Sequence, residues 1–261
     1  MEWGDPSAPP VVCWHGLART GRDFDELAIA LAADYWVLCP DTPGRGWSQW
    51  LRGVPQDYCF QTYEAVAVSL CDELGIGRLR WVGTSMGGHL GMRLAAGALK
   101  DRITHLVLND IGPEVPDQAI ERIVTYVGNP PAFDSLGELE QWLRTVYVPF
   151  GKNSDVFWRR MAETSARRTD SGQITVHYDP QLVRQFTEHS DDLDLWPTYD
   201  ALRVPTLLLR GRDSDVLPES VAQAMVQRGP CPELCTFEGC GHAPTLASAE
   251  QQVPVSSFLA S

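Results

Sequence analysis

The stretch Leu79-Arg80-Trp81-Val82-Gly83-Thr84-Ser85-Met86-Gly87-Gly88 leads from a short apolar run into a segment whose apolar residues Leu90 and Leu94 recur at helical spacing. A Gly-x-Ser-x-Gly set between a strand and a helix makes a turn so tight that only glycine fits two positions before and two positions after the serine. A glycine-rich turn with an incidental serine is the alternative, and the strand and helix patterns on either side disfavour it. The stretch therefore predicts a nucleophile elbow with Ser85 as the nucleophile.

Apolar runs like the one before Ser85 recur along the chain and alternate with helical patterns. They cover residues 11–14, 36–39, 79–82, 106–108, 206–211 and 234–237. Runs that are apolar on both faces are typical of parallel strands covered by helices on both sides. Helices are expected at residues 25–33, from an N-cap at Thr62 to Gly75, and after Ala247. This alternation predicts an α/β fold with a doubly wound, mostly parallel sheet.

The pattern changes between Pro113 and Pro197, where helical spacing dominates. Ser135 and Glu138 form a capping-box pattern before one helical segment, and another surrounds Trp158. We therefore expect a helical cap at residues 113–197, inserted into a core made of residues 1–112 and 198–261. The cap is rich in aromatic residues, which could line an apolar pocket as well as pack the cap on the core.

A second motif, Trp14-His15-Gly16-Leu17, follows the first apolar run. Attack by a serine on a carbonyl creates a negatively charged oxygen, which backbone N–H groups aimed in advance can stabilise. One donor is expected from Met86, directly after the nucleophile, and the other from Leu17 in this loop. His15 invites a catalytic interpretation, but we expect it to shape the loop through hydrogen bonds.

The third motif is Gly239-Cys240-Gly241-His242-Ala243-Pro244, in a loop after the last apolar run. A histidine in such a loop can reach the elbow across the end of the sheet and take the proton of Ser85. Of the six histidines, His242 is the one flanked by glycine after a late strand. His89 falls on the helix after the elbow and His105 at the start of a strand, so both are expected to be structural. The sequence thus predicts His242 as the catalytic base.

Charge and composition exclude several classes of partner. The chain has 21 basic and 34 acidic residues, for a net charge of −13, and no Lys/Arg run of the kind that nucleic-acid binding requires. No apolar stretch approaches a membrane span and no signal peptide is recognisable at Met1. The seven cysteines are an odd number and match no zinc spacing, which favours reduced thiols. We expect a cytoplasmic protein, a monomer or homodimer, that acts on a small molecule without a metal, a cofactor, nucleic acid or a membrane.

Together with Asp41-Thr42-Pro43-Gly44-Arg45-Gly46-Trp47-Ser48, the three motifs resemble those of the α/β-hydrolase superfamily over nearly the whole chain. The resemblance implies the α/β-hydrolase fold, with a helical cap between the sixth and seventh strands of the family, where the helical segment was found. Glu2-Trp3-Gly4 looks like the end of the second strand of the family. The first hairpin is therefore expected to be largely missing.

The resemblance also implies an acid that orients His242, and two places compete for it. The usual place follows the seventh family strand, where the chain has Ser214 between Asp213 and Asp215. A serine cannot stabilise an imidazolium as a carboxylate does. Some members carry the acid after the sixth strand instead, and Asp110 lies there, 25 positions after the nucleophile. We expect Asp110 to be the acid, with Asp215 as the alternative and Asp213 less favoured.

A serine at the elbow, where epoxide hydrolases and haloalkane dehalogenases of this superfamily carry aspartate, favours hydrolysis of a carboxylic ester through an acyl-enzyme. Amide, lactone or carbon–carbon bond hydrolysis uses the same three groups, so these reactions stay open. A ligand receptor of low turnover on the same fold is a further alternative. The expected substrate is a small to medium acyl compound.

Overall fold

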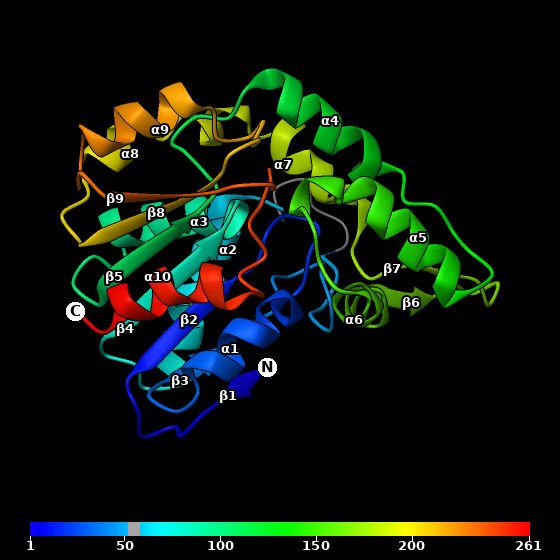
Figure 1. Cartoon of the computed structure of the whole chain (residues 1–261), viewed down its shortest axis with the longest axis horizontal. Coiled ribbons are helices and arrows are strands. Elements are labelled where there is room, and N and C mark those ends of the chain that lie inside the picture. The colour runs from blue at the N-terminus through cyan, green and yellow to red at the C-terminus, as the bar shows by residue number, and fades with distance from the viewer. Residues whose placement is uncertain (52–57) are drawn as a thin grey trace.

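The computed structural model describes residues 1–51 and 58–261, and its centre is one seven-stranded sheet (Figure 1). The strand order is β1-β3-β2-β4-β5-β8-β9, and all neighbours are parallel except β1 and β3. The strands are β1 (Glu2–Trp3), β2 (Pro10–Trp14), β3 (Trp36–Leu38), β4 (Leu79–Thr84), β5 (Ile103–Asn109), β8 (Thr206–Gly211) and β9 (Glu233–Phe237). The predicted α/β class and mostly parallel sheet are confirmed.

The strand β1 forms one edge of the sheet. This strand has two residues and pairs antiparallel with β3, Glu2 opposite Leu38 and Trp3 opposite Val37. The N-terminal amine of Met1 donates to the carbonyl of Cys39 at 3.1 Å, which ties the chain start to the same edge. Within the described residues, this edge of the sheet is therefore one short antiparallel strand.

Side chains of the central strands alternate between two apolar layers. Val11 and Cys13 of β2 point to the layer under α1 (Asp25–Leu31) and α10 (Ala249–Leu259). Val12 and Trp14 point to the opposite layer, under α2 (Phe60–Glu73) and α3 (Met86–Ala96). In that layer the indole of Trp14 stacks on that of Trp81 with ring centroids 5.3 Å apart. Helices thus cover both faces, as a doubly wound sheet requires.

The strand register gathers the loops that carry the sequence motifs. Trp14 lies opposite Gly83, Thr84 opposite Asn109, and Asn109 opposite Leu209. Parallel neighbours have their carboxyl ends at the same edge of the sheet, so the chain leaves all four strands side by side. The loops that follow β2, β4 and β5, and that contain His15, Ser85 and Asp110, therefore start side by side.

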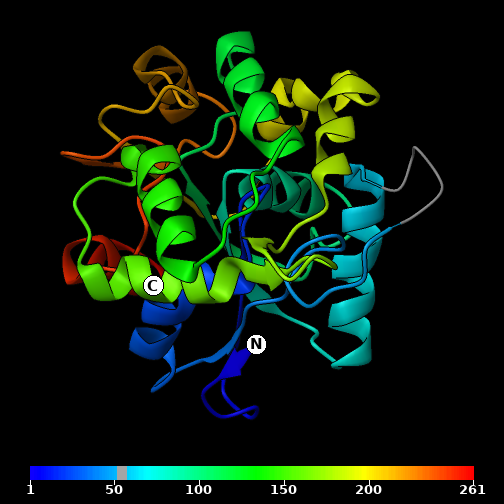
Figure 2. The same cartoon turned by 90° about the vertical axis from the view of Figure 1, so that its right-hand side faces the viewer.

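The segment between β5 and β8 is mostly helical and lies at one end of the molecule, on the right of Figure 1 and toward the viewer in Figure 2. It contains α4 (Asp117–Gly128), α5 (Leu136–Val146), α6 (Asp155–Ser165) and α7 (Arg184–Thr187), followed by α8 (Trp196–Asp200) beside the core. A two-stranded antiparallel sheet, β6 (Ala166–Arg168) with β7 (Ile174–Val176), interrupts the helices. The division of the chain at residues 113 and 197 stays a prediction.

Some helix starts differ from the expectation. The N-cap predicted at Thr62 is wrong, because α2 begins at Phe60 with Cys59 in the extended N-cap conformation. Phe60 is fully buried, and packing of this side chain sets where the first turn begins. Ser135 does cap α5, accepting from the backbone N–H of Glu138 at 3.2 Å. The helix α9 (Glu219–Val226) lies between β8 and β9 in the chain. Among the residues described, no helix combines the length and apolar character that crossing a membrane needs.

Candidate active site

Ser85 sits at the turn between β4 and α3, in a backbone conformation that side chains rarely adopt, with φ of 53° and ψ of −118°. The glycines around it are required by close backbone approaches. A Cβ on Gly83 would lie 2.2 Å from the carbonyl oxygen of Gly87, and one on Gly87 would lie 2.0 Å from the carbonyl oxygen of Trp14. The turn therefore has the steric demands expected of an elbow, and it exposes the serine at the end of the sheet.

His242 and Asp110 complete a chain of hydrogen bonds that starts at Ser85. Nε2 of His242 is 2.9 Å from Oγ of Ser85, and Nδ1 is 2.8 Å from Oδ2 of Asp110. Asp110 is fully buried, whereas the side chain of His242 is 13% exposed. A buried carboxylate at Nδ1 fixes the tautomer that leaves a lone pair on Nε2, facing the serine hydroxyl. The structure thus brings together the three residues that the sequence proposed.

Asp110 is held by two further donors besides the imidazole. The backbone N–H of Gly211 donates to Oδ1 at 2.8 Å, and the hydroxyl of Ser214 donates to Oδ2 at 2.6 Å. Ser214 in turn accepts from the backbone N–H of Leu217 at 3.0 Å, which orients its hydroxyl. The residue at the usual acid position of the family is therefore a hydrogen-bond donor to the carboxylate on the neighbouring strand. Sequence reasoning treated Ser214 only as a departure from the family pattern.

The two alternative acids lie outside this chain of hydrogen bonds. Both Asp213 and Asp215 are exposed. The carboxylate of Asp215 pairs with the guanidinium of Arg122 on α4, with contacts of 2.8 and 3.1 Å. In the structure Asp110, and neither of these residues, contacts the imidazole of His242.

Leu17 and Met86, the expected oxyanion donors, both border the nucleophile. They line the same pocket as Ser85, and a Cβ added to the neighbouring Gly16 would lie 3.6 Å from Cβ of Ser85. Met86 is the first residue of α3, so its backbone N–H stands at the positive end of that helix dipole. Within residues 1–51 and 58–261, neither N–H donates a hydrogen bond to the protein. Both amides are therefore available to an oxygen atom at the serine.

Arg45, in the loop after β3, contacts both candidate oxyanion residues, Leu17 and Met86. Its guanidinium is fully buried and donates to the carbonyl of Leu17 at 2.8 Å, to the hydroxyl of Tyr63 at 2.9 Å and to the sulfur of Met86 at 3.3 Å. No carboxylate in the described part of the chain forms an ion pair with it. A buried cation beside both candidate oxyanion residues favours negative charge there. The motif containing Arg45 was noticed in the sequence, but this contact was not.

Two further histidines near the site are neutral and structural. The ring of His15 is completely buried, and burial lowers its pKa to about 4. Its Nε2 accepts from the backbone N–H of Thr42 at 3.0 Å, so Nδ1 carries the proton and donates to the carbonyl of Gly16 at 2.7 Å. Burial also lowers the pKa of His89 to about 4, and its Nε2 bonds to the carbonyl of Gly112. His15 shapes the loop before Leu17, as expected.

Two pockets meet at Ser85 and differ in polarity. The first is lined by Ser85 with Leu17, Met86 and mostly aliphatic side chains from the segment between β5 and β8. The second is lined by Ser85 with His242, by the aromatic residues Tyr126, Tyr147 and Phe150, and by the charged residues Arg19, Asp23 and Arg122. We call them the apolar pocket and the polar pocket. Leu17, Ser85 and Ile123 line both, so a molecule at the serine could extend into each.

Comparison with known proteins places this arrangement in a family. A model of the alpha/beta hydrolase family matches residues 11–254. The chain belongs to the α/β-hydrolase family. A crystal structure of an α/β hydrolase from Novosphingobium aromaticivorans is 38% identical, with a TM-score of 0.88 over 99% of this chain and 91% of that one.

Two curated relatives are named as hydrolases. A 3-hydroxybutyrate-oligomer hydrolase from Cupriavidus necator is 39% identical over 260 residues, covering 96% of this chain and 88% of that protein. A 2-hydroxy-6-oxononadienedioate/2-hydroxy-6-oxononatrienedioate hydrolase from Burkholderia vietnamiensis is 27% identical over 235 residues, covering 87% of this chain and 76% of that protein. The relatives are hydrolases, and this chain is an α/β hydrolase.

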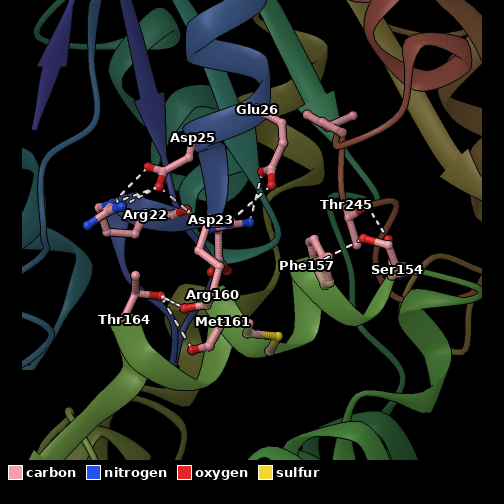
Figure 3. A network of polar contacts seen from close by, with 12 residues as sticks. Arg22, Asp23, Asp25, Glu26, Ser154, Phe157, Arg160, Met161, Thr164 and Thr245 are labelled. Atoms are coloured by element: carbon pink, nitrogen blue, oxygen red, sulfur yellow. Dashed lines mark hydrogen bonds and ion pairs between the residues drawn. The ribbon is translucent and has the colours of Figure 1, made fainter.

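In this α/β hydrolase, charged side chains join the helical segment between β5 and β8 to the first helix of the chain (Figure 3). Arg160 on α6 forms a two-pronged ion pair with Glu26 on α1, at 3.0 and 2.8 Å, and also donates to the carbonyl of Arg22. Figure 3 shows these contacts beside the Arg22–Asp25 pair. They hold α6 against the start of α1, next to Asp23, which lines the polar pocket. Within the described ranges, no group of three His, Cys, Asp or Glu residues is placed to hold a metal ion.

Proposed function

We propose that this α/β hydrolase is a serine esterase that cleaves carboxylic esters through an acyl-enzyme. The observation that carries the proposal is the hydrogen-bonded series from Oγ of Ser85 to Nε2 of His242 and from Nδ1 to Asp110, at 2.9 and 2.8 Å. A serine hydroxyl is a weak nucleophile on its own. A base at hydrogen-bond distance, oriented by a buried carboxylate, removes its proton as it attacks.

The reaction has two halves. Oγ of Ser85 attacks the ester carbonyl while Nε2 of His242 takes the proton of the serine hydroxyl. The carbonyl oxygen becomes negative and accepts hydrogen bonds from the backbone N–H groups of Leu17 and Met86. The tetrahedral intermediate then collapses, the bond to the alkoxide breaks, and the imidazolium of His242 gives the proton to the leaving alcohol. A water molecule gives a proton to the same imidazole as it attacks the acyl-enzyme. The bond between the acyl carbon and Oγ then breaks, the imidazolium returns the proton to Oγ of Ser85, and the acid leaves. Asp110 stabilises the imidazolium in both halves.

The position of His242 assigns the two sides of the ester to the two pockets. The imidazolium must be next to the oxygen of the leaving alcohol in order to protonate it. His242 lines the polar pocket and does not line the apolar one, which is lined by Met86 instead. The leaving alcohol therefore belongs in the polar pocket and the acyl chain in the apolar pocket.

Esters of short hydroxy acids fit this division, and they are the substrate class that we propose. The relative from Cupriavidus necator is named for 3-hydroxybutyrate oligomers. Cleavage of such an oligomer from the free-acid end releases an alcohol that carries a carboxylate. The polar pocket contains the guanidinium of Arg122 on α4. Its Nε and Nη2 already pair with Asp215, and its Nη1, which has no partner among the described residues, can donate to a carboxylate.

The test compares the wild type with Ser85→Ala on the linear dimer of 3-hydroxybutyrate and on p-nitrophenyl acetate. Ser135→Ala, at the N-cap of α5, is the matched serine control. We expect turnover by the wild type and the control, loss of at least about 1000-fold in Ser85→Ala, and covalent labelling of Ser85 by an organophosphonate. Equal rates in all three proteins would refute the proposal. Labelling of Ser85 without hydrolysis of any ester, amide, lactone or carbon–carbon bond would indicate a receptor of low turnover.

A further inference from the structure

The apolar pocket contains a polar side chain that has no hydrogen bond and that the catalytic scheme leaves unused. Gln185 on α7 is 2% exposed and lines this pocket with Ser85 and Met86. Its Oε1 is buried without a hydrogen-bond partner, and within the described residues its Nε2 has none either. Buried polar side chains are nearly always hydrogen-bonded, because leaving one unpaired destabilises the fold. An unpaired amide at this depth therefore needs an explanation.

The surroundings of Gln185 make its amide conspicuous. The other lining residues from the cap and from the loops after β5 and β8 are apolar: Ile111, Val115, Ile120, Ile123, Phe186, Leu193 and Val216. His89 also lines the pocket, but its Nε2 already bonds to the carbonyl of Gly112 at 2.7 Å. In an apolar surrounding, a hydrogen bond to the amide of Gln185 is worth more than in water, and an unmade one costs more.

We propose that Gln185 determines acyl specificity by binding a hydroxyl group on the acyl chain of the substrate. The proposal rests on the proposed ester hydrolysis, which places the acyl chain in this pocket. A hydroxyl both donates and accepts, so it can satisfy Oε1 or Nε2, whichever the soft terminal torsion of the side chain turns toward it. A carboxylate does not fit, because among the lining residues no cation is available to compensate its burial.

The two pockets then select the two ends of one molecule. Gln185 binds the hydroxyl of the acyl part, and the polar pocket takes the alcohol part with its carboxylate. An acyl chain without the hydroxyl would bury the amide of Gln185 unpaired in the transition state, a penalty that discriminates more strongly than a missing methyl group does. Gln185 is therefore assigned to substrate selection and takes no part in the proton transfers of the mechanism.

The test measures kcat/KM for ethyl 3-hydroxybutyrate and ethyl butyrate, which share a leaving group and differ by one hydroxyl. Gln185→Met keeps the size of the side chain and removes its polar atoms. We expect the preference for the hydroxy ester to fall roughly 10- to 100-fold in Gln185→Met, through a rise with ethyl butyrate as well as a loss with the hydroxy ester. Ethyl 3-methoxybutyrate, which can accept from Nε2 but cannot donate to Oε1, should gain less from Gln185 than the hydroxy ester does.

Phe186→Leu is the matched control, because it changes the volume of the same pocket without changing its polarity. It should move both rates together and leave their ratio within about threefold. The melting temperature of Gln185→Met should equal or exceed that of the wild type, since an unpaired buried amide is removed. If Gln185→Met does not fold, Gln185→Leu provides the same comparison.

Two outcomes separate the two proposals. If the wild type cleaves both esters and Gln185→Met leaves the ratio of their kcat/KM values unchanged, the role of Gln185 is overturned and the esterase proposal stays intact. A wild type that cleaves no ester, while Ser85 and His242 are folded as described, overturns the esterase proposal and with it the role of Gln185.

Discussion

Replacing Asp110 with asparagine removes the carboxylate that contacts Nδ1 of His242 at 2.8 Å. The amide group of asparagine can donate to Nδ1, which would leave the proton on Nε2 and deprive Ser85 of its base. Two unit charges about 4 Å apart attract each other by about 4 kcal/mol at an effective dielectric constant of about 20. Loss of that attraction and of the correct tautomer predicts a fall in kcat of about 10⁴-fold, which corresponds to about 5 kcal/mol.

The controls are the two neighbouring aspartates of the alternative position. Asp213 and Asp215 are exposed, and Asp215 is paired with Arg122, so Asp213→Asn and Asp215→Asn should change kcat by less than about threefold. The assay is steady-state hydrolysis of p-nitrophenyl acetate, with circular dichroism to establish that each variant is folded. A collapse of kcat in Asp215→Asn, or a loss below tenfold in Asp110→Asn, would refute the assignment of the acid.

A relocation of the acid tests the same geometry in the opposite direction. Ser214→Asp alone puts a second carboxylate within hydrogen-bond distance of Asp110, since Oγ of Ser214 lies 2.6 Å from Oδ2. Two carboxylates at one site share a proton, so this single variant should lose activity. In the double variant Asp110→Asn, Ser214→Asp the repulsion is absent and a carboxylate again faces His242. We expect at least a tenfold recovery of kcat over Asp110→Asn.

Three further predictions concern the frame of the site. Gly87→Ala should lower the free energy of unfolding by at least about 3 kcal/mol, because its Cβ would lie 2.0 Å from a backbone oxygen. The control Gly77→Ala has nothing within 4 Å of its Cβ and should change the free energy of unfolding by less than about 0.5 kcal/mol. Unfolding in urea measures both variants. His89 has a pKa lowered to about 4, so its contribution to stability is complete above pH 6.5 and is lost as the pH falls toward 4, by about 3 kcal/mol. His89→Gln should flatten the pH dependence of unfolding in that window by a similar amount, and an unchanged slope would contradict the buried neutral ring. Arg160→Met should lower the free energy of unfolding by about 1–2 kcal/mol, because it loses its ion pair with α1. Arg159→Met changes a more exposed residue of the same helix and should lower it by less than about 0.5 kcal/mol. Thermal unfolding measures both variants.

Sequence patterns located the strands and the order of the fold because each central strand is buried on both faces. A run such as Val11–Trp14 is apolar at every position, and no surface element tolerates that. Helix starts were harder to place. At α2 the sequence offers Thr62 as a good cap, but burial of Phe60 outweighs the capping preference of about 1 kcal/mol, so the helix begins three residues earlier.

Some site residues can be recognised from the sequence and others cannot, depending on whether a local motif or tertiary packing positions them. Ser85, His242, Leu17 and Met86 stand in local motifs with glycines, and such motifs are visible in the sequence because the backbone itself is constrained there. Gln185 stands in no motif. It lies on a four-residue helix in the cap and approaches Ser85 only through tertiary packing. The same holds for the cation of Arg45 behind the oxyanion loop, whose neighbours come from three separate segments.

The choice between Asp110 and an acid after β8 shows why spacing alone could not settle the matter. Asn109 pairs with Leu209, so the ends of β5 and β8 are one strand spacing apart, about 4.8 Å, although a hundred residues separate them in sequence. A carboxylate from either strand end can therefore reach the same nitrogen of His242. The residue on the other strand end then becomes a neighbour of that carboxylate, and it must donate a hydrogen bond rather than bring a second negative charge. Ser214 meets this requirement, since its hydroxyl donates to Asp110. A serine at the usual acid position thus follows from an aspartate at position 110, and the two positions can be exchanged only as a pair.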